Sequence, residues 1–229
     1  TLQRFHRDGT LEAGWPSSGV QTRNYLRGYG DAHSGWVATA DGATWRAFAR
    51  DNKVWAFRVA QNAVVTSPAG ANGWSLGSAY DMKVAAAPAP SYGLYVATQN
   101  RLRRVTPVGA TAAGWAAGGM APLTPGTTYE HQYMSLAEDG EGGVYVFDPG
   151  WASAGTGPRL NHVDSTGSVH AGWPTGGLAL DTLEYTTTDL GPMRSALVRS
   201  GTDRVIVAWR DVETDGDRAL HVQCYTSAG

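Results

Sequence analysis

The sequence predicts an all-β protein: a β-propeller of four to five blades, built from four-stranded antiparallel sheets, with the terminal strands closing the ring. Three observations lead to this fold class. The 229 residues include 30 Gly, 11 Pro, 9 Trp and 10 Tyr, which favours short strands joined by tight turns. A Gly-Trp phrase recurs along the chain, and β-hairpins recur in step with it. No segment carries an apolar stripe long enough for an amphipathic helix.

The Gly-Trp phrase occurs four times, as "LEAGWPSSGV" (11–20), "AGANGWSLGS" (69–78), "TAAGWAAGGM" (111–120) and "VHAGWPTGGL" (169–178). An isolated Trp between glycines would suit an exposed stacking platform. Recurrence in step with the hairpins favours packing instead, because glycines admit close backbone approach. We therefore expect four wedges at the outer turns of the blades: Trp15, Trp74, Trp115 and Trp173.

Four hairpins lie between these phrases, within residues 37–50, 84–98, 133–147 and 195–209. Each has a polar or Gly-containing turn between two strands of about five or six residues. Second strands such as "VYVF" and "VIVAW" are apolar at successive positions, which predicts that both of their faces are covered. Sheets stacked around an axis provide such cover, and a β-sandwich is the alternative architecture.

A further strand recurs five times, with a basic or imidazole side chain at an aligned position: His6, Arg58, Arg104, His162 and His221. The spacing matches one blade of a propeller. We expect a single domain over residues 1–229, with units at 1–22 plus 192–229, 34–81, 82–122 and 131–180. Residues 1–20 are the expected partner of the strands at 195–225, and four blades or five both fit the copy numbers.

Charge and cysteine content exclude several classes of function. The formal net charge of −2 and pI near 6.3 leave no electrostatic footprint for nucleic acid or an anionic membrane. The basic run "RLRR" at 101–104 is expected on a solvated strand face or in cross-strand pairs. No run is long enough for membrane insertion, and a single Cys224 excludes an internal disulfide framework. Because the chain starts at Thr1, it is expected to be a processed protein or an excised segment.

Parts of the repeat resemble a known group of proteins. "VAWRD", followed after a loop by "DRALHVQCYTSAG", and "DGTLEAGWPSSGV" are similar to the tandem propeller-type repeats of large secreted bacterial proteins. The last unit alone keeps the Trp-x-Asp strand end of that pattern, as Trp209 and Asp211. Likeness to five-bladed tachylectin-type lectins is more distant, since only repeat length and Gly-Trp pairs are shared. This resemblance implies a secreted or cell-surface location and further repeats in a larger chain.

One acidic segment, "DVETDGDR" at 211–218, is a candidate calcium site. Four acidic side chains alternate around Gly216, as at the start of a calcium-binding loop: Asp211, Glu213, Asp215 and Asp217. The twelfth position, where such a loop places a bidentate Glu, is Val222. Calcium binding would therefore need ligands from elsewhere, and a solvated acidic loop is the alternative. The sequence suggests no other cofactor.

Aromatic side chains outside the Gly-Trp phrase are the candidate ligand contacts, because aromatic rings stack on sugar faces or anchor a protein partner. Most of the aromatic residues outside the phrase, a set that includes Tyr92, are expected in the core. The candidates are Trp151, in the Gly-rich insertion 148–158, with Trp36, Trp55 and Tyr129. We therefore expect a non-catalytic extracellular module that binds glycans, or a protein partner, through loops and inter-blade pockets.

Two alternatives from other classes stay open. A propeller-type glycoside hydrolase or lyase would use tunnel-facing carboxylates, although the acidic residues lie mostly in turns or at strand ends and no pair stands apart. No catalytic residue is assigned. A purely structural repeat domain of a larger surface protein is the other alternative, since fold alone does not establish function.

Overall fold

The computed structural model describes residues 2–20, 32–33, 35–67, 73–78, 84–98, 101–120, 134–148, 157–180, 195–212 and 218–228. All regular structure in these ranges is β-strand, apart from one 3-10 turn, η2 (Pro90–Tyr92). Within the same ranges, no helix is long and apolar enough to cross a membrane. The prediction of an all-β protein is confirmed.

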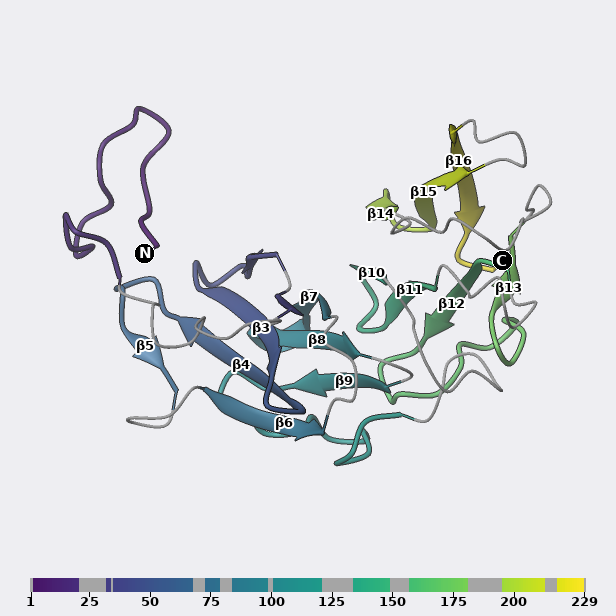
Figure 1. Ribbon diagram of the computed structural model, residues 1–229, viewed down its shortest axis with the longest axis horizontal. Helices are drawn as coiled ribbons and strands as arrows, with labels where there is room; N and C mark the ends of the chain where they lie inside the picture. The colour runs from purple at the N-terminus through teal and green to yellow at the C-terminus, as the bar shows by residue number, and fades with distance from the viewer. Residues whose placement is uncertain are drawn as a thin grey trace.

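The strands form four antiparallel sheets (Figure 1). The first contains β1 (Ala32–His33), β2 (Val37–Ala38), β3 (Thr44–Arg50), β4 (Lys53–Val59), β5 (Val65–Thr66) and β6 (Trp74–Ser78). The second contains β7 (Ala85–Ala89), β8 (Gly93–Thr98) and β9 (Arg101–Val105). The third contains β10 (Ser135–Glu138), β11 (Val144–Asp148), β12 (Arg159–Val163) and β13 (Leu178–Ala179). The fourth contains β14 (Ser195–Ser200), β15 (Arg204–Val212) and β16 (Arg218–Thr226).

Each sheet is built around one of the predicted hairpins. The hairpin pairs are β2–β3, β7–β8, β10–β11 and β14–β15, and the recurring strand adds to each pair as β4, β9, β12 or β16. The second strands β8 and β11 are buried along their whole length. Their continuous apolar sequences are therefore explained by cover on both faces, as predicted. For "VIVAW" in β15 the prediction is wrong: buried residues alternate with partly exposed ones, because only one face packs against the third sheet.

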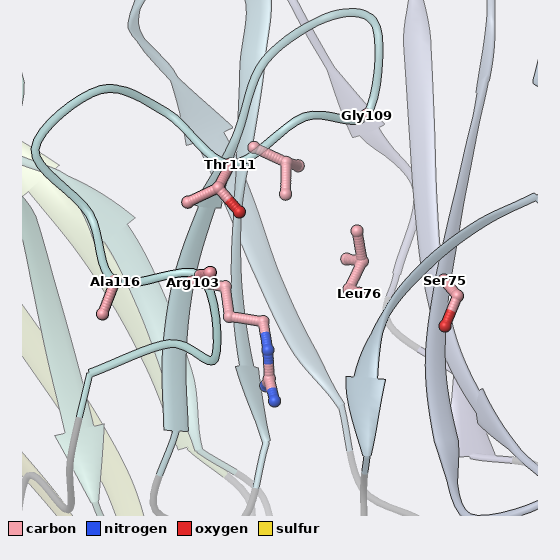
Figure 2. Close-up of a pocket in the computed structure, with 8 residues that line it drawn as sticks. Ser75, Leu76, Arg103, Gly109, Thr111 and Ala116 are labelled. Atoms are coloured by element: carbon pink, nitrogen blue, oxygen red, sulfur yellow. The ribbon is translucent and has the colours of Figure 1, made fainter.

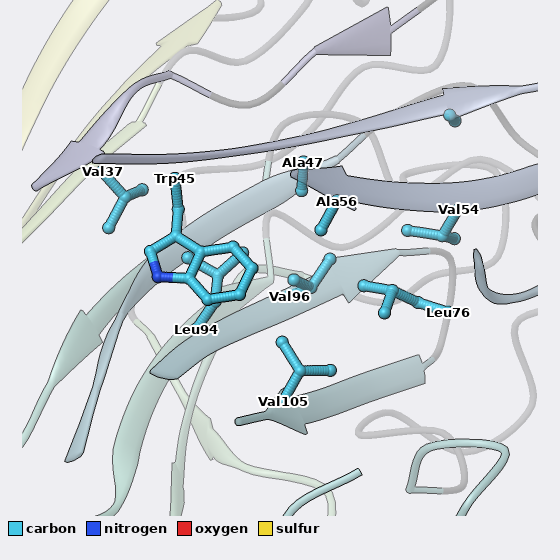
Figure 3. Close-up of a cluster of buried hydrophobic side chains, with 10 residues drawn as sticks. Val37, Trp45, Ala47, Val54, Ala56, Leu76, Leu94, Val96 and Val105 are labelled. Atoms are coloured by element: carbon cyan, nitrogen blue, oxygen red, sulfur yellow. The ribbon is translucent and has the colours of Figure 1, made fainter. Parts of the chain in front are cut away.

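Successive sheets pack face to face, and each interface has its own apolar core. Figure 3 shows the core between the first and second sheets, where Trp45 and Val54 meet Val96 and Val105. Separate clusters join the second sheet to the third and the third sheet to the fourth. The sheets consequently follow one another along an arc in chain order (Figure 1).

Residues 2–20, the N-terminal unit, form a small hairpin with bridges between Leu2 and Val20 and between Phe5 and Leu11. Its apolar face packs on the first sheet, where Trp15 contacts the cluster around Phe57. The unit lies at the opposite end of the arc from β14–β16 (Figure 1). In the described ranges it pairs with no strand of the fourth sheet, so the expected pairing of 1–20 with 195–225 is absent there.

The Gly-Trp tryptophans pack as wedges, as predicted, but they dock on the following unit and not only at the outer turn of their own blade. The indole Nε1 of Trp15 donates to the carbonyl of Gln61 at 2.7 Å. Trp115 and Trp173 make the same contact with Ser165 of the third unit and Ser227 of the fourth. Trp74 differs, because its ring lies against Gly109, where a Cβ would come within 2.1 Å of the indole Cγ. All four tryptophans therefore join a unit to the turn after the third strand of the next unit.

The structure corrects the alignment of the first copy of the recurring strand. In the turn that follows it, the amide of Gly9 donates to the carbonyl of His6, as the amide of Gly167 donates to Asp164. His6 thus occupies the position of Asp164, and the residue equivalent to His162 is Arg4. The prediction for His6 is wrong by two residues. In a strand such a shift keeps the side chain on the same face, so alternation could not reveal it.

The last copy is also shifted. Trp173 donates to the carbonyl of Ser227, as Trp115 donates to Ser165, which makes Ser227 and Ser165 equivalent. Counting back three residues from each shows that Cys224, and not His221, is equivalent to His162. The prediction for His221 is wrong by three residues, because the basic side chain that guided it is absent from the true position.

Candidate functional site

The hairpin turns of three successive sheets enclose an open cleft of about 400 Å³. Because β2, β7 and β10 are the first hairpin strands of adjacent sheets and β7 contacts both β2 and β10, their turns lie side by side. The side chains and backbone that line it include Thr39, Ala40, Pro90, Tyr92, Glu138 and Gly142. The cleft is thus created by the stacking of units and is absent from any single repeat.

Tyr92 is the aromatic residue of the cleft, and the residue is 49% exposed. Its backbone φ is +64° and that of Ser91 is +55°, a conformation that non-glycine residues rarely adopt. The indole Nε1 of Trp45 donates to the Tyr92 carbonyl at 3.1 Å. The position after Tyr92 requires a glycine, Gly93, since a Cβ there would lie 2.3 Å from the Val105 carbonyl oxygen. These contacts hold the strained backbone that places Tyr92 in the lining of the cleft.

Glu138 supplies a carboxylate to the same cleft. Its Oε1 lies 2.9 Å from Nη2 of Arg199, and its Oε2 accepts the amide of Gly140 at 2.8 Å. The carboxylate is therefore oriented by two donors while one third of its side-chain surface stays accessible. A partly exposed, held carboxylate can accept hydrogen bonds from ligand hydroxyls.

The neighbouring turns are fixed by their own hydrogen bonds. Thr39 donates through Oγ1 to Asp41 at 2.7 Å, and Asp41 pairs with Arg58. Burial alone would raise the pKa of Asp41, but these contacts and the Ala43 amide outweigh it and lower the pKa. The Tyr95 hydroxyl donates to the Gly142 carbonyl, and burial raises the pKa of that phenol. Rigid walls reduce the entropy cost of binding a ligand.

A buried polar pair lies behind the cleft in the third sheet. Nε2 of His162 is 2.9 Å from Oδ2 of Asp139, and Oδ1 of Asp139 accepts the amides of Glu141 and Gly143. Burial would raise the pKa of Asp139, but the His162 and amide hydrogen bonds together lower it. Tyr145 stacks on His162 with ring centroids 4.1 Å apart. Because both partners are buried, this pair supports the turn and does not reach a ligand.

A second, much smaller hollow of about 60 Å³ lies between the first and second sheets (Figure 2). In Figure 2, Leu76 and Ser75 flank one side and Arg103 and Thr111 the other. The Arg103 guanidinium is buried and donates to Thr98 Oγ1 at 2.9 Å. Arg103 belongs to the run expected on a solvated strand face or in cross-strand pairs. The solvated face is wrong for this residue, which is buried between the sheets and contacts Thr98 of the neighbouring strand. The space left beside it is too small for a sugar ring.

Two of the four predicted ligand-contact residues lie within the described ranges. Trp36 is 37% exposed; Arg46 lies over its ring at 5.0 Å, and its edge packs on Phe57. Trp55 packs against the core under the N-terminal unit, and its Nε1 donates to the Arg50 carbonyl at 3.3 Å. Neither residue lines the cleft. Their ligand-binding role stays a prediction.

The other predicted site residues lie outside the described ranges, or their side chains do. Trp151, Tyr129, Glu213, Asp215 and Asp217 are outside them. The backbone of Asp211 pairs with Ala219 near the end of β15, but its side chain is not described. In the described part of the chain, no three His, Cys, Asp or Glu side chains gather as metal ligands. The calcium prediction therefore stays untested.

Sequence reasoning missed the cleft: Tyr92 belonged to the general aromatic set but not to the four ligand-contact candidates. A signal was present. "PSYG" at 90–93 occupies the hairpin-turn position where the neighbouring hairpins carry Gly42 and Gly140–Gly143. A Tyr at a turn that normally needs glycine is strained and exposed, which indicates a role other than packing.

Comparison with known proteins shows the fold and no sequence family. No protein-family model matches the chain, and no curated protein matches it. The structure is similar to a protein of unknown function from Bacteroides caccae, with 12% identity and a TM-score of 0.56 over 99% of this chain and 71% of that one. A protein of unknown function from Dyadobacter fermentans gives 13% identity and a TM-score of 0.52 over 82% of this chain and 51% of that one.

A weaker match, with a TM-score of 0.45 and 14% identity, is a putative glucose dehydrogenase from Thermus thermophilus, covering 97% of this chain and 82% of that one. The chain thus has a distant structural likeness to bacterial β-propeller proteins. The fold places the chain in the all-β class, as a stack of antiparallel sheets. At these identities the likeness carries no activity over to this chain.

Proposed function

We propose that the chain is a non-catalytic, lectin-like binding module that recognises glycans through the cleft at Tyr92. The observation that carries the proposal is that an exposed aromatic residue and an oriented carboxylate line the same cleft. The apolar face of a pyranose stacks on the Tyr92 ring, while its hydroxyls donate to Glu138 and bond to the exposed Ser91 hydroxyl. An uncharged polar ligand fits best, because Arg199 already balances the charge of Glu138.

The proposal includes a secreted or cell-surface location and a β-propeller of four to five blades. The described sheets contain six, three, four and three strands, so a four-stranded blade is part of the proposal; the repeated tryptophan contacts between units support a serial stack of blades. Closure of the ring by the terminal strands is not part of the proposal, because residues 2–20 and β14–β16 do not pair in the described ranges. Further repeats in a larger chain are part of the same proposal.

A protein ligand is the alternative occupant of the cleft. A turn-built cleft with one exposed aromatic residue offers few of the apolar anchors that protein interfaces use, which favours a small polar ligand. The glycan test below distinguishes these occupants.

The hydrolase or lyase alternative needs carboxylates that are available for proton transfer or attack. Three acids near the cleft are instead engaged: Glu138 with Arg199, Asp41 with Arg58 and Asp139 with His162. Lowered pKa values at Asp41 and Asp139 keep both ionised, which suits structural pairing and not a general acid. These features favour binding over catalysis.

The test is a glycan array probed with the wild type, Tyr92→Ala and a matched control, Trp36→Ala. Trp36 is also a partly exposed aromatic residue, but it lies outside the cleft. We expect a restricted set of glycan signals that weaken at least about tenfold in Tyr92→Ala and persist in Trp36→Ala. Signals lost in Trp36→Ala alone would move the site, and an array without signals would favour the purely structural alternative. Turnover of a glycan would instead favour the enzyme.

A further inference from the structure

A recurring short strand covers the outer edge of the third strand in several units. In the N-terminal unit, Leu2 and Val20 exchange both of their backbone hydrogen bonds, at 3.0 and 2.7 Å. In the second sheet, the Met120 amide donates to the Leu102 carbonyl at 2.9 Å. In the third sheet, β13 pairs with β12 through Leu160 and Leu178. Each covering strand is the end of a Gly-Trp phrase.

The same phrase also covers the forward face of its sheet, meaning the face toward the following unit. In the third sheet His162 lies on this face, with its ring stacked on His170 at 4.1 Å. Trp173 meets His162 edge-on at 5.3 Å. The imidazole is therefore enclosed by two residues of the phrase, and its side chain is buried.

The fourth sheet has no such cover in the described ranges. Its strand order is β14–β15–β16, and no described strand pairs with the outer edge of β16. Along this edge Leu220 is 73% exposed and Val222 is 61% exposed. Cys224, the position equivalent to His162, is also exposed. A long strand edge without charged side chains at these positions invites strand pairing.

The exposed face continues across the sheet. Val198 pairs with Ile206, and Ile206 pairs with Cys224, so the three side chains share one face. Ala196, Ala208 and Val222 form the neighbouring row. Val198 is 56% exposed. The fourth sheet thus presents an apolar forward face beside an open strand edge.

We propose that β16 binds an extended Gly-Trp-Pro strand supplied by another repeat unit. The strand pairs antiparallel with the edge, and its Trp covers Cys224 as Trp173 covers His162. By equivalence with Leu2 and Leu160, Val222 offers both its amide and its carbonyl to the incoming strand. Backbone hydrogen bonds supply affinity, while the Trp and the apolar face supply specificity.

A second copy of this chain is not the expected donor. Its own phrases are engaged, since Trp15, Trp115 and Trp173 each donate to a carbonyl of the next unit. Trp74 is packed on Trp45 with centroids 5.5 Å apart. Releasing a phrase would expose one of these cores, so the donor is a separate Gly-Trp-Pro segment.

The test uses a synthetic peptide with the sequence "SVHAGWPTGGLAL", residues 168–180 of this chain. Cys224 is the only cysteine of the chain and serves as an unmodified reporter through its rate of reaction with a thiol reagent. We expect saturating peptide to slow this reaction about tenfold or more. A peptide with Trp173→Ala, and one N-methylated at the amide of Leu178, are expected to give no protection, since each lacks one contact and leaves the protein unchanged.

A protein variant, Val222→Pro, removes the amide that faces the incoming strand, and proline is tolerated at strand edges. We expect it to lose peptide binding, measured by fluorescence anisotropy of a labelled peptide, while the circular dichroism spectrum is retained. Wild-type Cys224 that reacts equally fast with and without peptide would overturn the proposal. Equal protection by the N-methylated peptide would overturn the strand-pairing geometry even if Val222→Pro fails to fold.

Discussion

The indole nitrogen of Trp115 donates a hydrogen bond to the backbone carbonyl of Ser165 at 3.0 Å, across the interface between the second and third sheets. Trp173 makes the equivalent bond to Ser227 at 2.7 Å. Each contact joins the Gly-Trp phrase of one unit to the turn after the third strand of the next unit. The stack is therefore held by a repeated tryptophan and by apolar burial between sheets.

Replacing this tryptophan separates its two contributions. Trp115→Ala is expected to lower the free energy of unfolding by about 3–5 kcal/mol, because it leaves a cavity between two sheets. Trp115→Phe retains an aromatic ring and leaves the Ser165 carbonyl without this donor, and we expect a loss of about 1–3 kcal/mol. Urea denaturation measures both values. A Phe variant as unstable as the Ala variant would contradict the wedge role of the ring.

Gly109 and Gly14 form a matched pair for testing the Trp74 contact. Both have positive φ, at +78° and +84°, so an alanine strains both backbones. A Cβ on Gly109 would lie 2.1 Å from the Trp74 ring, whereas nothing lies within 4 Å of one on Gly14. We expect Gly14→Ala to lower the free energy of unfolding by about 1 kcal/mol and Gly109→Ala to lower it several-fold more. Equal losses of melting temperature would mean that Trp74 does not pack on this turn.

The buried Asp139 makes the free energy of unfolding depend on pH in the acidic range. Its pKa is lowered in the folded chain, so the unfolded chain binds the proton more readily as pH falls through the ordinary value of 3.8. The stabilisation is present above that pH and is lost as pH falls further through the folded pKa. We expect Asp139→Asn to lose about 1–3 kcal/mol at pH 7 and to show a shallower decline between pH 5 and 3. Parallel curves for both proteins would contradict the assignment.

The strained turn beneath Tyr92 predicts a stabilising substitution. Ser91 has a φ of +55°, which glycine adopts without a steric penalty. Ser91→Gly is expected to raise the free energy of unfolding by up to about 1 kcal/mol, measured by thermal denaturation. A fall in stability would indicate that the Ser91 side chain, and not the backbone, holds the turn.

Much of the fold follows from local sequence. The four hairpins were predictable because polar or Gly-containing turns separate short apolar strands, and the continuous apolar sequence of β11 indicated cover on both faces. The alignment of His6 and His221 with the other copies could not be predicted, because each strand carries a basic or imidazole side chain two or three residues from the equivalent position. Only the turn hydrogen bonds of Gly9 and Trp173 fix the register.

The candidate site was less accessible to sequence reasoning than the fold. Tyr92 and Glu138 are 46 positions apart in the chain and meet only because three turns converge. Aromatic content alone also selected Trp55, whose ring packs against the core and whose indole nitrogen bonds to Arg50. Exposure and convergence are properties of packed units, so residue type could not distinguish these two aromatic side chains.

The proposed glycan site is tested most directly by two-dimensional amide NMR with the strongest glycan from the array. The account predicts shifts at the amides of Ser91, Tyr92, Gly140 and Gly142, which line the cleft, and an unchanged indole signal from Trp36. It also predicts that Tyr92→Phe binds with nearly wild-type affinity, since the stacking ring is kept. Shifts centred on Trp36, or unchanged binding in Tyr92→Ala, would contradict it.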